Sequence, residues 1–221
     1  MHVTDEGSEK PQNAGKQRPS GRRKQTDRTE ATRSSLMTAA RGLFTERGYE
    51  GVGTEEIVRA AGVTRGALYH HFPGGKAALL EAVYMQLEAE STERVARIVL
   101  DSEFESPVAA MKAGIAAFLE ECADPELRQI ALHDAPAVLG WDRWREIGAA
   151  NGLGLIEASL GAAIEAGEIR PLPVKPLAHL LLGALDEGAM LVARDENPAS
   201  RAEVTATLGA LLDGFAVSPH P

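Results

Sequence analysis

Residues 64–71 carry side chains that can bind phosphates and read the edges of bases. Arg65 has a guanidinium whose parallel N–H groups match the two acceptors on a guanine edge. Gly66 and Ala67 are small enough to let the backbone approach another surface closely, and free N–H groups at a helix N-terminus bind phosphate. Hydroxyl and imidazole groups, which can also hold phosphates, are supplied by Thr64, Tyr69, His70 and His71. An ordinary helical hairpin with solvated polar residues would show the same composition.

Two short helices joined by a tight turn would position these side chains. Thr54 is a good N-cap, and Glu55 and Glu56 place carboxylates in the first turn, at the positive end of the helix dipole. Gly62 can end that helix in a left-handed conformation, and Thr64 caps the next helix at once. So short a connection containing glycine is typical of a helix-turn-helix, which places its second helix in a DNA groove. The inside of the pair would consist of Ile57, Ala61, Val63, Leu68 and Phe72.

This stretch resembles the DNA-binding domain of the tetracycline repressor (TetR) family. Family positions are matched in order by Thr54, Ile57, Ala61-Gly62-Val63-Thr64, Gly66, Leu68-Tyr69, His71-Phe72, Lys76 and Leu79. One departure is a third residue between the Phe and the Lys, because Pro73, Gly74 and Gly75 stand where many members have two residues. The resemblance implies a transcriptional repressor that contacts DNA through Thr54, Thr64, Arg65, Gly66, Ala67, Tyr69, His70, His71 and Lys76. Within this set, Arg65 and the turn from Thr64 to Ala67 would read bases, and the others would hold phosphates.

Charge is distributed unevenly along the 221 residues, whose net charge is −9. Residues 1–76 contain 13 Lys and Arg against 9 Asp and Glu, which gives +4, and residues 77–221 contain 10 against 23, which gives −13. Phosphate binding is mainly cationic, so the distribution predicts a DNA-binding end on an acidic body with another role.

Helical signals predict an all-α protein. Residues 1–25 are basic and nearly free of apolar side chains, which predicts a flexible arm that follows the minor groove or a solvated tail without a role. Asp27 with Glu30 forms a capping box that would begin the first helix, and a later helix would run over 75–100. Capping residues and prolines then predict helices over 106–123, 125–134, 141–167, 174–195 and 199–216. We therefore expect an arm over 1–25, a helix-turn-helix domain over 26–75, and a C-terminal helical domain for ligand binding and dimerisation over 76–221.

The last two predicted helices carry broad apolar stripes. Such stripes often close the core of a monomer. The family resemblance implies instead that these helices pair with their symmetry mates in a four-helix dimer interface. The interface residues would be Leu177, Leu181, Ala184, Leu185, Gly188, Leu208, Leu211, Leu212 and Phe215.

The middle of the chain holds aromatic and polar residues without an evident structural duty: Phe104, Phe118, His133, Asp134, Trp141, Trp144 and Asn151. Each taken singly suits a packed core, but as a group they fit an apolar pocket with a few orienting polar groups. In TetR-like proteins this region binds the inducer, so the resemblance implies a small hydrophobic or aromatic ligand that releases a dimeric repressor from a palindromic operator.

Other functions find little support in the sequence. His133 and Asp134 are adjacent, which places them on different helix faces, and no phosphate-cradling loop, His-Glu-x-x-His motif or nucleophile elbow is present, so neither an enzyme nor a cofactor or metal site is expected. A helical binding module without operator recognition is the other alternative. The single cysteine, Cys122, fits a reducing compartment. The polar N-terminus and the lack of a long uncharged apolar run predict a cytoplasmic protein, associated with the nucleoid when bound to DNA, with no membrane partner.

Overall fold

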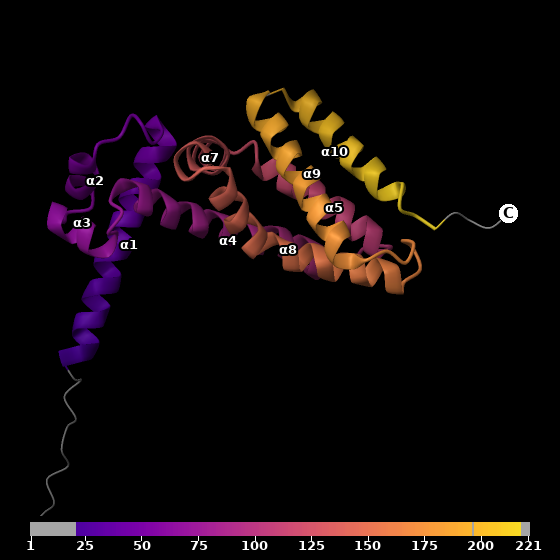
Figure 1. The fold of residues 1–221 in the computed structure, drawn as a ribbon, viewed down its shortest axis with the longest axis horizontal. Helices are drawn as coiled ribbons and strands as arrows, with labels where there is room; N and C mark the ends of the chain where they lie inside the picture. The colour runs from indigo at the N-terminus through magenta and orange to yellow at the C-terminus, as the bar shows by residue number, and fades with distance from the viewer. Residues whose placement is uncertain (1–20, 196, 218–221) are drawn as a thin grey trace, which may run out of the picture.

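The structure is a computed structural model that describes residues 21–195 and 197–217, with side chains from residue 28 onward. All regular elements in this part of the chain are helices (Figure 1), which confirms the all-α prediction. They are α1 (Gly21–Arg47), α2 (Thr54–Ala60), α3 (Arg65–His71), α4 (Lys76–Asp101), α5 (Pro107–Glu121), α6 (Pro125–Leu127), the π-helix η1 (Arg128–Asp134), α7 (Ala135–Leu139), α8 (Trp141–Glu165), α9 (Val174–Arg194) and α10 (Pro198–Asp213).

The first helix begins earlier than predicted. It starts at Gly21 and runs through Asp27, so the predicted helix start at Asp27 is wrong. Residues 22–25 are Arg, Arg, Lys and Gln, which all have high helix propensity and contain no breaker. The last residues of the predicted flexible arm are therefore helical, and its residues 1–20 lie outside the described part of the chain.

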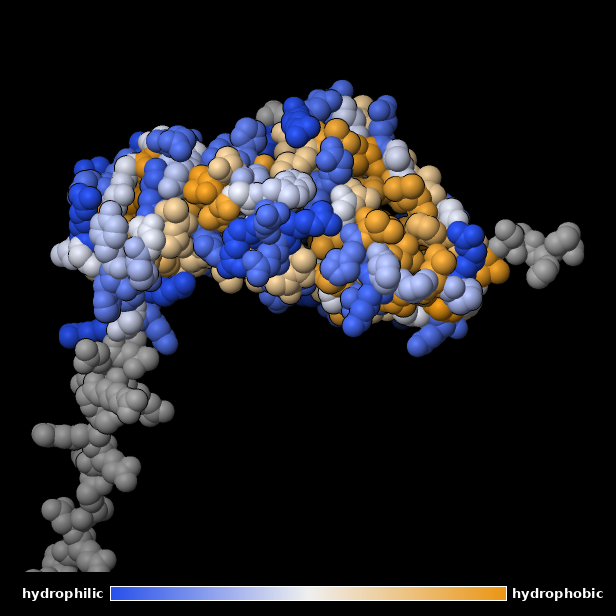
Figure 2. Space-filling view, in the orientation of Figure 1, coloured by the Kyte–Doolittle hydropathy of each residue, from blue (hydrophilic) through white to orange (hydrophobic). Residues whose placement is uncertain are grey.

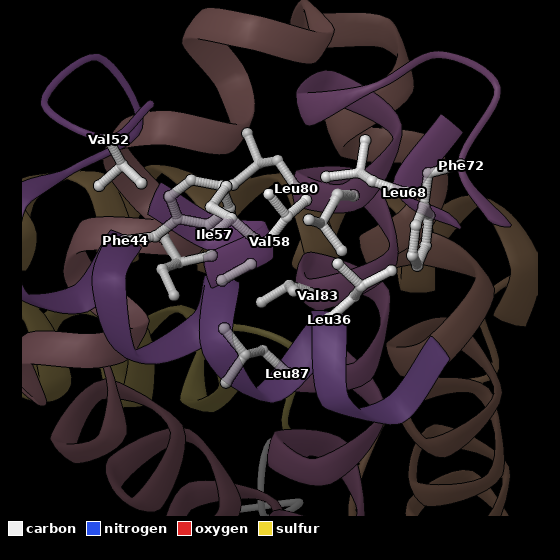
Figure 3. Packing of buried hydrophobic residues seen from close by; sticks show 13 residues of the cluster. Leu36, Phe44, Val52, Ile57, Val58, Leu68, Phe72, Leu80, Val83 and Leu87 are labelled. Carbon is white, nitrogen blue, oxygen red and sulfur yellow. The ribbon is translucent and has the colours of Figure 1, made fainter. Parts of the chain in front are cut away.

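The helix-turn-helix region has a core of its own (Figure 3). Leu36 and Phe44 of α1, Ile57 of α2 and Leu68 of α3 are fully buried. The α4 side chains Leu79, Leu80, Val83 and Leu87 close this core, together with Ile130 of η1. The DNA-binding end is therefore packed against the start of α4 and against a helix of the C-terminal region.

The C-terminal helices form a second body around the far half of α4. Here α4 packs on α5 and α8, and α9 packs on α8 and α10. Figure 1 shows α4 leading from the helix-turn-helix region into this body. On the face drawn in Figure 2, hydrophobic residues gather on the C-terminal half, and the helix-turn-helix end is mostly hydrophilic.

Residues 125–139 differ from the single α-helix predicted over 125–134. Asp124 caps the start as expected, accepting from the amide of Glu126 at 2.9 Å, but the helix widens into η1 and then continues as α7. The amide of Ala135 donates to the carbonyl of Ile130, five residues back. Pro136 has no N–H, so it cannot donate to the carbonyl of Ala131, five residues back. The indole N–H of Trp144 donates to this carbonyl instead, at 2.8 Å. Trp144 therefore stabilises the π-helix from outside.

Two helices, α8 and α9, are long and apolar enough to cross a membrane by length and composition. Core helices of soluble proteins have the same properties, and half of the apolar window of α9 is buried inside the protein. Both helices pack within the C-terminal body.

Candidate nucleic-acid interface and ligand cavity

The turn between α2 and α3 has the geometry that its sequence predicts. Gly62 has a φ of 67°, and the amide of Val63 donates to the carbonyl of Val58 at 3.0 Å. Thr64 caps α3, because its hydroxyl accepts from the amide of Ala67 at 3.2 Å. The predicted cap at Thr54 is wrong by one residue: Gly53 is the N-cap of α2, and no side chain caps it.

The outer face of α3 presents its polar groups to solvent. Thr64, Arg65, His70 and Tyr69 are exposed, and His71 is partly buried. Arg65 pairs with Glu55 at 2.8 Å and lies over the ring of Tyr69. Both partners of the ion pair are more than half exposed, at 60% and 68%, and ion pairs so exposed to water contribute little to stability. The guanidinium can therefore exchange Glu55 for a DNA partner at small cost.

Gly66 has no role inside the chain that requires a glycine. A Cβ at this position would meet only the hydroxyl of Thr64, at 3.8 Å, and glycine within a helix costs about 1 kcal/mol relative to alanine. The missing side chain leaves room on the exposed face of α3. This is the room that a close approach to a DNA backbone needs.

Lys76, which is predicted to contact phosphate, binds a loop of the protein itself. Its ammonium donates to the carbonyls of Tyr49 at 2.8 Å and Val52 at 2.9 Å, and it lies 3.8 Å from the centre of the Tyr49 ring. These carbonyls take two of the three N–H donors of the ammonium, and the phosphate contact predicted for Lys76 stays a prediction. Gly75 precedes it with a φ of 65°, in the left-handed region that favours glycine.

Asp134, predicted to bind ligand, instead bonds the same loop from the other side. Its carboxylate accepts from the amide of Tyr49 at 2.7 Å and from the side chain of Gln129 at 3.2 Å. Burial raises the pKa of Asp134. The loop between α1 and α2 is therefore held by Lys76 of α4 and by Asp134 of η1.

An ion-pair group joins the two bodies nearby. Arg41 of α1 pairs with Glu126 of α6 at 2.7 Å and with Glu90 of α4 at 2.9 Å. Hydrogen bonding from Arg41 lowers the pKa of Glu126. With Asp134, these bonds connect the segment from α6 to η1 directly to the helix-turn-helix region.

A cavity of about 130 Å³ lies inside the C-terminal body. Its walls come from α4, α5, α8, α9 and α10, together with Leu127 and Leu132 from the segment between α5 and α7. Of the predicted ligand residues, Phe118 and Trp144 line it. An engineered apolar cavity of about 150 Å³ holds a benzene molecule, so this space is close in size to one that binds a single aromatic ring.

Four other residues predicted to bind ligand do not line the cavity. His133 is exposed, and Trp141 is 49% exposed and stacks on Trp144. Asn151 donates to the carbonyl of Ile147 in its own helix, and Phe104 lies in the connection before α5. The cavity contacts predicted for these four residues are not found, because the sequence did not show which helix faces turn inward at His133, Trp141 and Asn151, and because Phe104 lies outside the helices.

The cavity contains acidic side chains that the sequence analysis missed. Glu88 of α4 and Asp186 of α9 line it, with Tyr84 and Arg145. Burial and the nearby Asp186 raise the pKa of Glu88 to about 7, and burial raises the pKa of Asp186 to about 6. One signal was available in the sequence, because Asp186 interrupts the apolar stripe of its helix directly after Leu185.

Comparison with known proteins agrees with this architecture. Residues 36–83 match the family model described as bacterial regulatory proteins, tetR family, and residues 108–215 match the tetracyclin repressor-like C-terminal domain. A crystal structure of a TetR-family transcriptional regulator from Pectobacterium atrosepticum is 35% identical, covers 88% of this chain and 98% of that one, and superposes with a TM-score of 0.77. The chain belongs to the TetR family.

Other TetR-family relatives support the same assignment. The Transposon Tn10 TetC protein of Escherichia coli is 28% identical over 72% of this chain and 79% of its own length. FadR of Bacillus subtilis, a transcriptional regulator solved in complex with stearoyl-CoA, shares the fold at 19% identity, with a TM-score of 0.65 over 82% of this chain and 98% of its own. The chain is thus a DNA-binding transcriptional regulator and not an enzyme.

TetR-family regulators act as dimers, but all except one of the residues predicted to form the interface face inward in this chain. Of that set, Leu177, Leu181, Gly188, Leu208 and Leu212 are buried within the chain itself. Ala184, Leu185 and Phe215 pack against the same cores, and only Leu211 is exposed. The predicted stripe is the core face of α9 and α10. The apolar side chains that these helices turn outward are Leu180, Leu191 and Leu211, which are 72%, 46% and 47% exposed.

Proposed function

We propose that this protein is a homodimeric repressor that binds a palindromic operator in the cytoplasm and is released by a small, largely apolar ligand in the cavity. The observation that carries the ligand response is the position of η1 and its flanks. Leu127 and Leu132 form part of the cavity wall, and Asp134, at the end of η1, bonds the loop that precedes the helix-turn-helix. A ligand that moves this wall must therefore also move Asp134 or strain its bond.

The path from cavity to DNA is short and consists of direct contacts. Trp144 lines the cavity, and its indole N–H donates a hydrogen bond to the carbonyl of Ala131 in η1. The carboxylate of Asp134 accepts a hydrogen bond from the amide of Tyr49, and the carbonyl of Tyr49 accepts one from the ammonium of Lys76. Lys76 is the first residue of α4, which follows the recognition helix after a short turn. Ligand binding can thus change the orientation of α3 through bonds that lie on one connected path.

Dimerisation is proposed through the outward faces of α9 and α10, around Leu180, Leu191 and Leu211. Two recognition helices in one dimer must lie about 34–36 Å apart, or a larger multiple of one helical turn, to enter successive major grooves. A change of a few ångströms in that separation is enough to mismatch the second half-site. This makes a small movement at η1 an effective switch.

Asp134→Ala is expected to uncouple ligand from operator. A compound that quenches tryptophan fluorescence and raises the melting temperature would first be selected from a small-molecule library. In the wild type, it should weaken operator binding by about 5–150-fold, and operator should weaken its binding by the same factor. The coupling factor is measured by titrating operator DNA with and without the compound, and the compound with and without operator DNA.

Asp134→Asn is the matched control, because its amide oxygen can still accept from Tyr49. We expect it to keep most of the coupling factor, whereas Asp134→Ala should bring the factor close to one. A compound bound at Trp144 that leaves operator affinity unchanged in the wild type would refute the proposed ligand response.

Gly66→Ala separates folding from DNA binding. The added methyl meets nothing within the chain closer than 3.8 Å and removes a helix glycine, so the melting temperature should stay the same or rise. Operator affinity should nevertheless fall, because the methyl occupies the space that the DNA backbone needs. Differential scanning fluorimetry and an operator titration test both parts, and unchanged affinity would show that α3 does not approach DNA at this residue.

A further inference from the structure

The charged groups around the cavity do not balance. Asp186 pairs with Arg145 at 3.2 Å. Glu121 of α5 pairs with Arg94 at 2.8 Å and accepts from the hydroxyl of Ser91 at 2.6 Å. Among the ion pairs of the described residues, none includes Glu88. Glu88 is therefore a carboxyl group at the cavity that has no cationic partner in the described part of the chain.

Glu88 is positioned at the cavity wall between α4 and α8. Its Oε2 atom lies 3.9 Å from the place that a Cβ of Gly148 would occupy, and the hydroxyl of Tyr84 lies 3.8 Å from the same place. That hydroxyl is bonded to the carbonyl of Trp144 at 3.2 Å. Glycines at 148 and 152 keep the facing wall on α8 free of side chains, which leaves space beside the carboxylate.

We propose that the cavity takes a cationic ligand with an apolar, preferably aromatic, portion and places the ligand's positive charge at Glu88. This inference rests on the proposed function, since it specifies the ligand class of the same site. A buried carboxylate is costly unless it is paired, and a ligand cation supplies the missing partner. An anionic ligand would instead face both Glu88 and Asp186.

Aromatic rings add to the selectivity for cations. Tyr84, Phe118 and Trp144 line the cavity, and ring faces attract ammonium groups. Most of the remaining lining is aliphatic, with Val95, Met111 and Ile115 from α4 and α5. A ligand with one aromatic ring and one ammonium group satisfies both the charge and the volume of about 130 Å³.

Protonation of Glu88 should control this binding. Burial, followed by the charge of Asp186, raises the pKa of Glu88 to about 7. The other charged or titratable groups near it are Tyr84 on its own helix, Glu121 and Cys122 from α5 and its end, and Arg145 from α8. A cation binds the ionised form, so below the pKa it must first displace a proton. Affinity should therefore fall about tenfold for each pH unit below about 7 and level off above it.

Three probes of matched size test the inference on the full-length protein. Benzylammonium is the cation, ethylbenzene is its neutral isostere, and phenylacetate is an anion of similar shape. Quenching of tryptophan fluorescence gives the dissociation constants at about pH 8, where the amine is protonated. We expect benzylammonium to bind more tightly than ethylbenzene, and phenylacetate to bind least.

Glu88→Gln keeps the shape of the side chain and removes its charge. It should weaken benzylammonium binding by about tenfold or more, change ethylbenzene binding by less than about twofold, and remove the fall in affinity that begins near pH 7. Glu93→Gln is the matched control, because it makes the same change at an exposed position on the same helix and should have no effect. Melting temperatures confirm that both variants are folded.

Several outcomes would overturn the cationic-ligand inference. One is that ethylbenzene or phenylacetate binds as tightly as benzylammonium. Another is that the Glu88→Gln variant binds benzylammonium with the affinity of the wild type. A third is that none of the probes binds. These results come from binding alone, so they leave the proposed ligand response untouched. Benzylammonium that binds through Glu88 without weakening operator binding would support the inference and count against the proposed function.

Discussion

A variant with both Leu180→Glu and Leu191→Glu is expected to be a folded monomer that binds operator about 10²- to 10⁴-fold more weakly than the wild type. Both side chains lie on the outward face of α9, at 72% and 46% exposure, so the changes disturb little of the chain's own core. In a dimer interface they would place several carboxylates in a dry, apolar contact. A monomer has only one recognition helix to offer, and it loses the effective concentration that links two half-sites.

Analytical ultracentrifugation and operator titration measure the two effects of this variant. Leu181→Glu provides an informative comparison, because Leu181 is only 8% exposed and lines the cavity. We expect that substitution to lower the melting temperature strongly. A double variant that remains dimeric and binds operator fully would show that the interface lies elsewhere on the molecule.

Arg65→Ala is expected to cost about 1–3 kcal/mol of operator binding and to relax the base preference at one position in each half-site. Arg65 is the only Lys or Arg on α3, and its pair with Glu55 is exposed, so the fold should lose little stability. Operator selection from random DNA, followed by affinity measurements on the best site and on single-base variants, tests the assignment.

Arg59→Ala is the control for the charge change. Arg59 is exposed in the last turn of α2, and its removal should change affinity about equally for all DNA sequences if it has any effect. A selected motif that is the same for Arg65→Ala and the wild type would refute base reading by Arg65.

The helix-turn-helix could be predicted from the sequence because its signals are local. Gly62 and Thr64 end one helix and begin the next through bonds that span no more than five residues, and the structure confirms both. The apolar spacing of α2 and α3 likewise predicted buried side chains at Ile57 and Leu68. The error at Thr54 was one residue, because Gly53 can adopt the cap conformation without a side-chain bond.

Most residues predicted for the dimer face are buried in their own chain, because helical periodicity identifies a buried face without identifying what covers it; the pairing of α9 and α10, with Leu211, stays a prediction. Leu177, Leu181 and Leu212 repeat as an interface stripe would, but they pack in the core of their own chain. The outward side chains that remain, such as Leu180 and Leu191, form a weaker pattern in the sequence. Only the packing of α9 and α10 on the body decided which face is free.

Contacts between distant residues were likewise decided by tertiary structure. Lys76 reaches Tyr49, 27 residues away, and Tyr49 reaches Asp134, 85 residues away. The residues next to them in the sequence do not show that Lys76 and Asp134 bind a loop of the protein and not a phosphate or a ligand.

The sequence by itself determined the all-α fold class, the turn at Gly62, the family and the DNA-binding role, because these depend mainly on residues that are neighbours in the chain. The tertiary structure decided which polar groups meet. Glu88 and Asp186 come from two helices far apart in the chain and line one cavity only because α4 and α9 pack around the same space. The pKa and the partners of a charged side chain depend on the groups around it, and helix packing decides which groups those are.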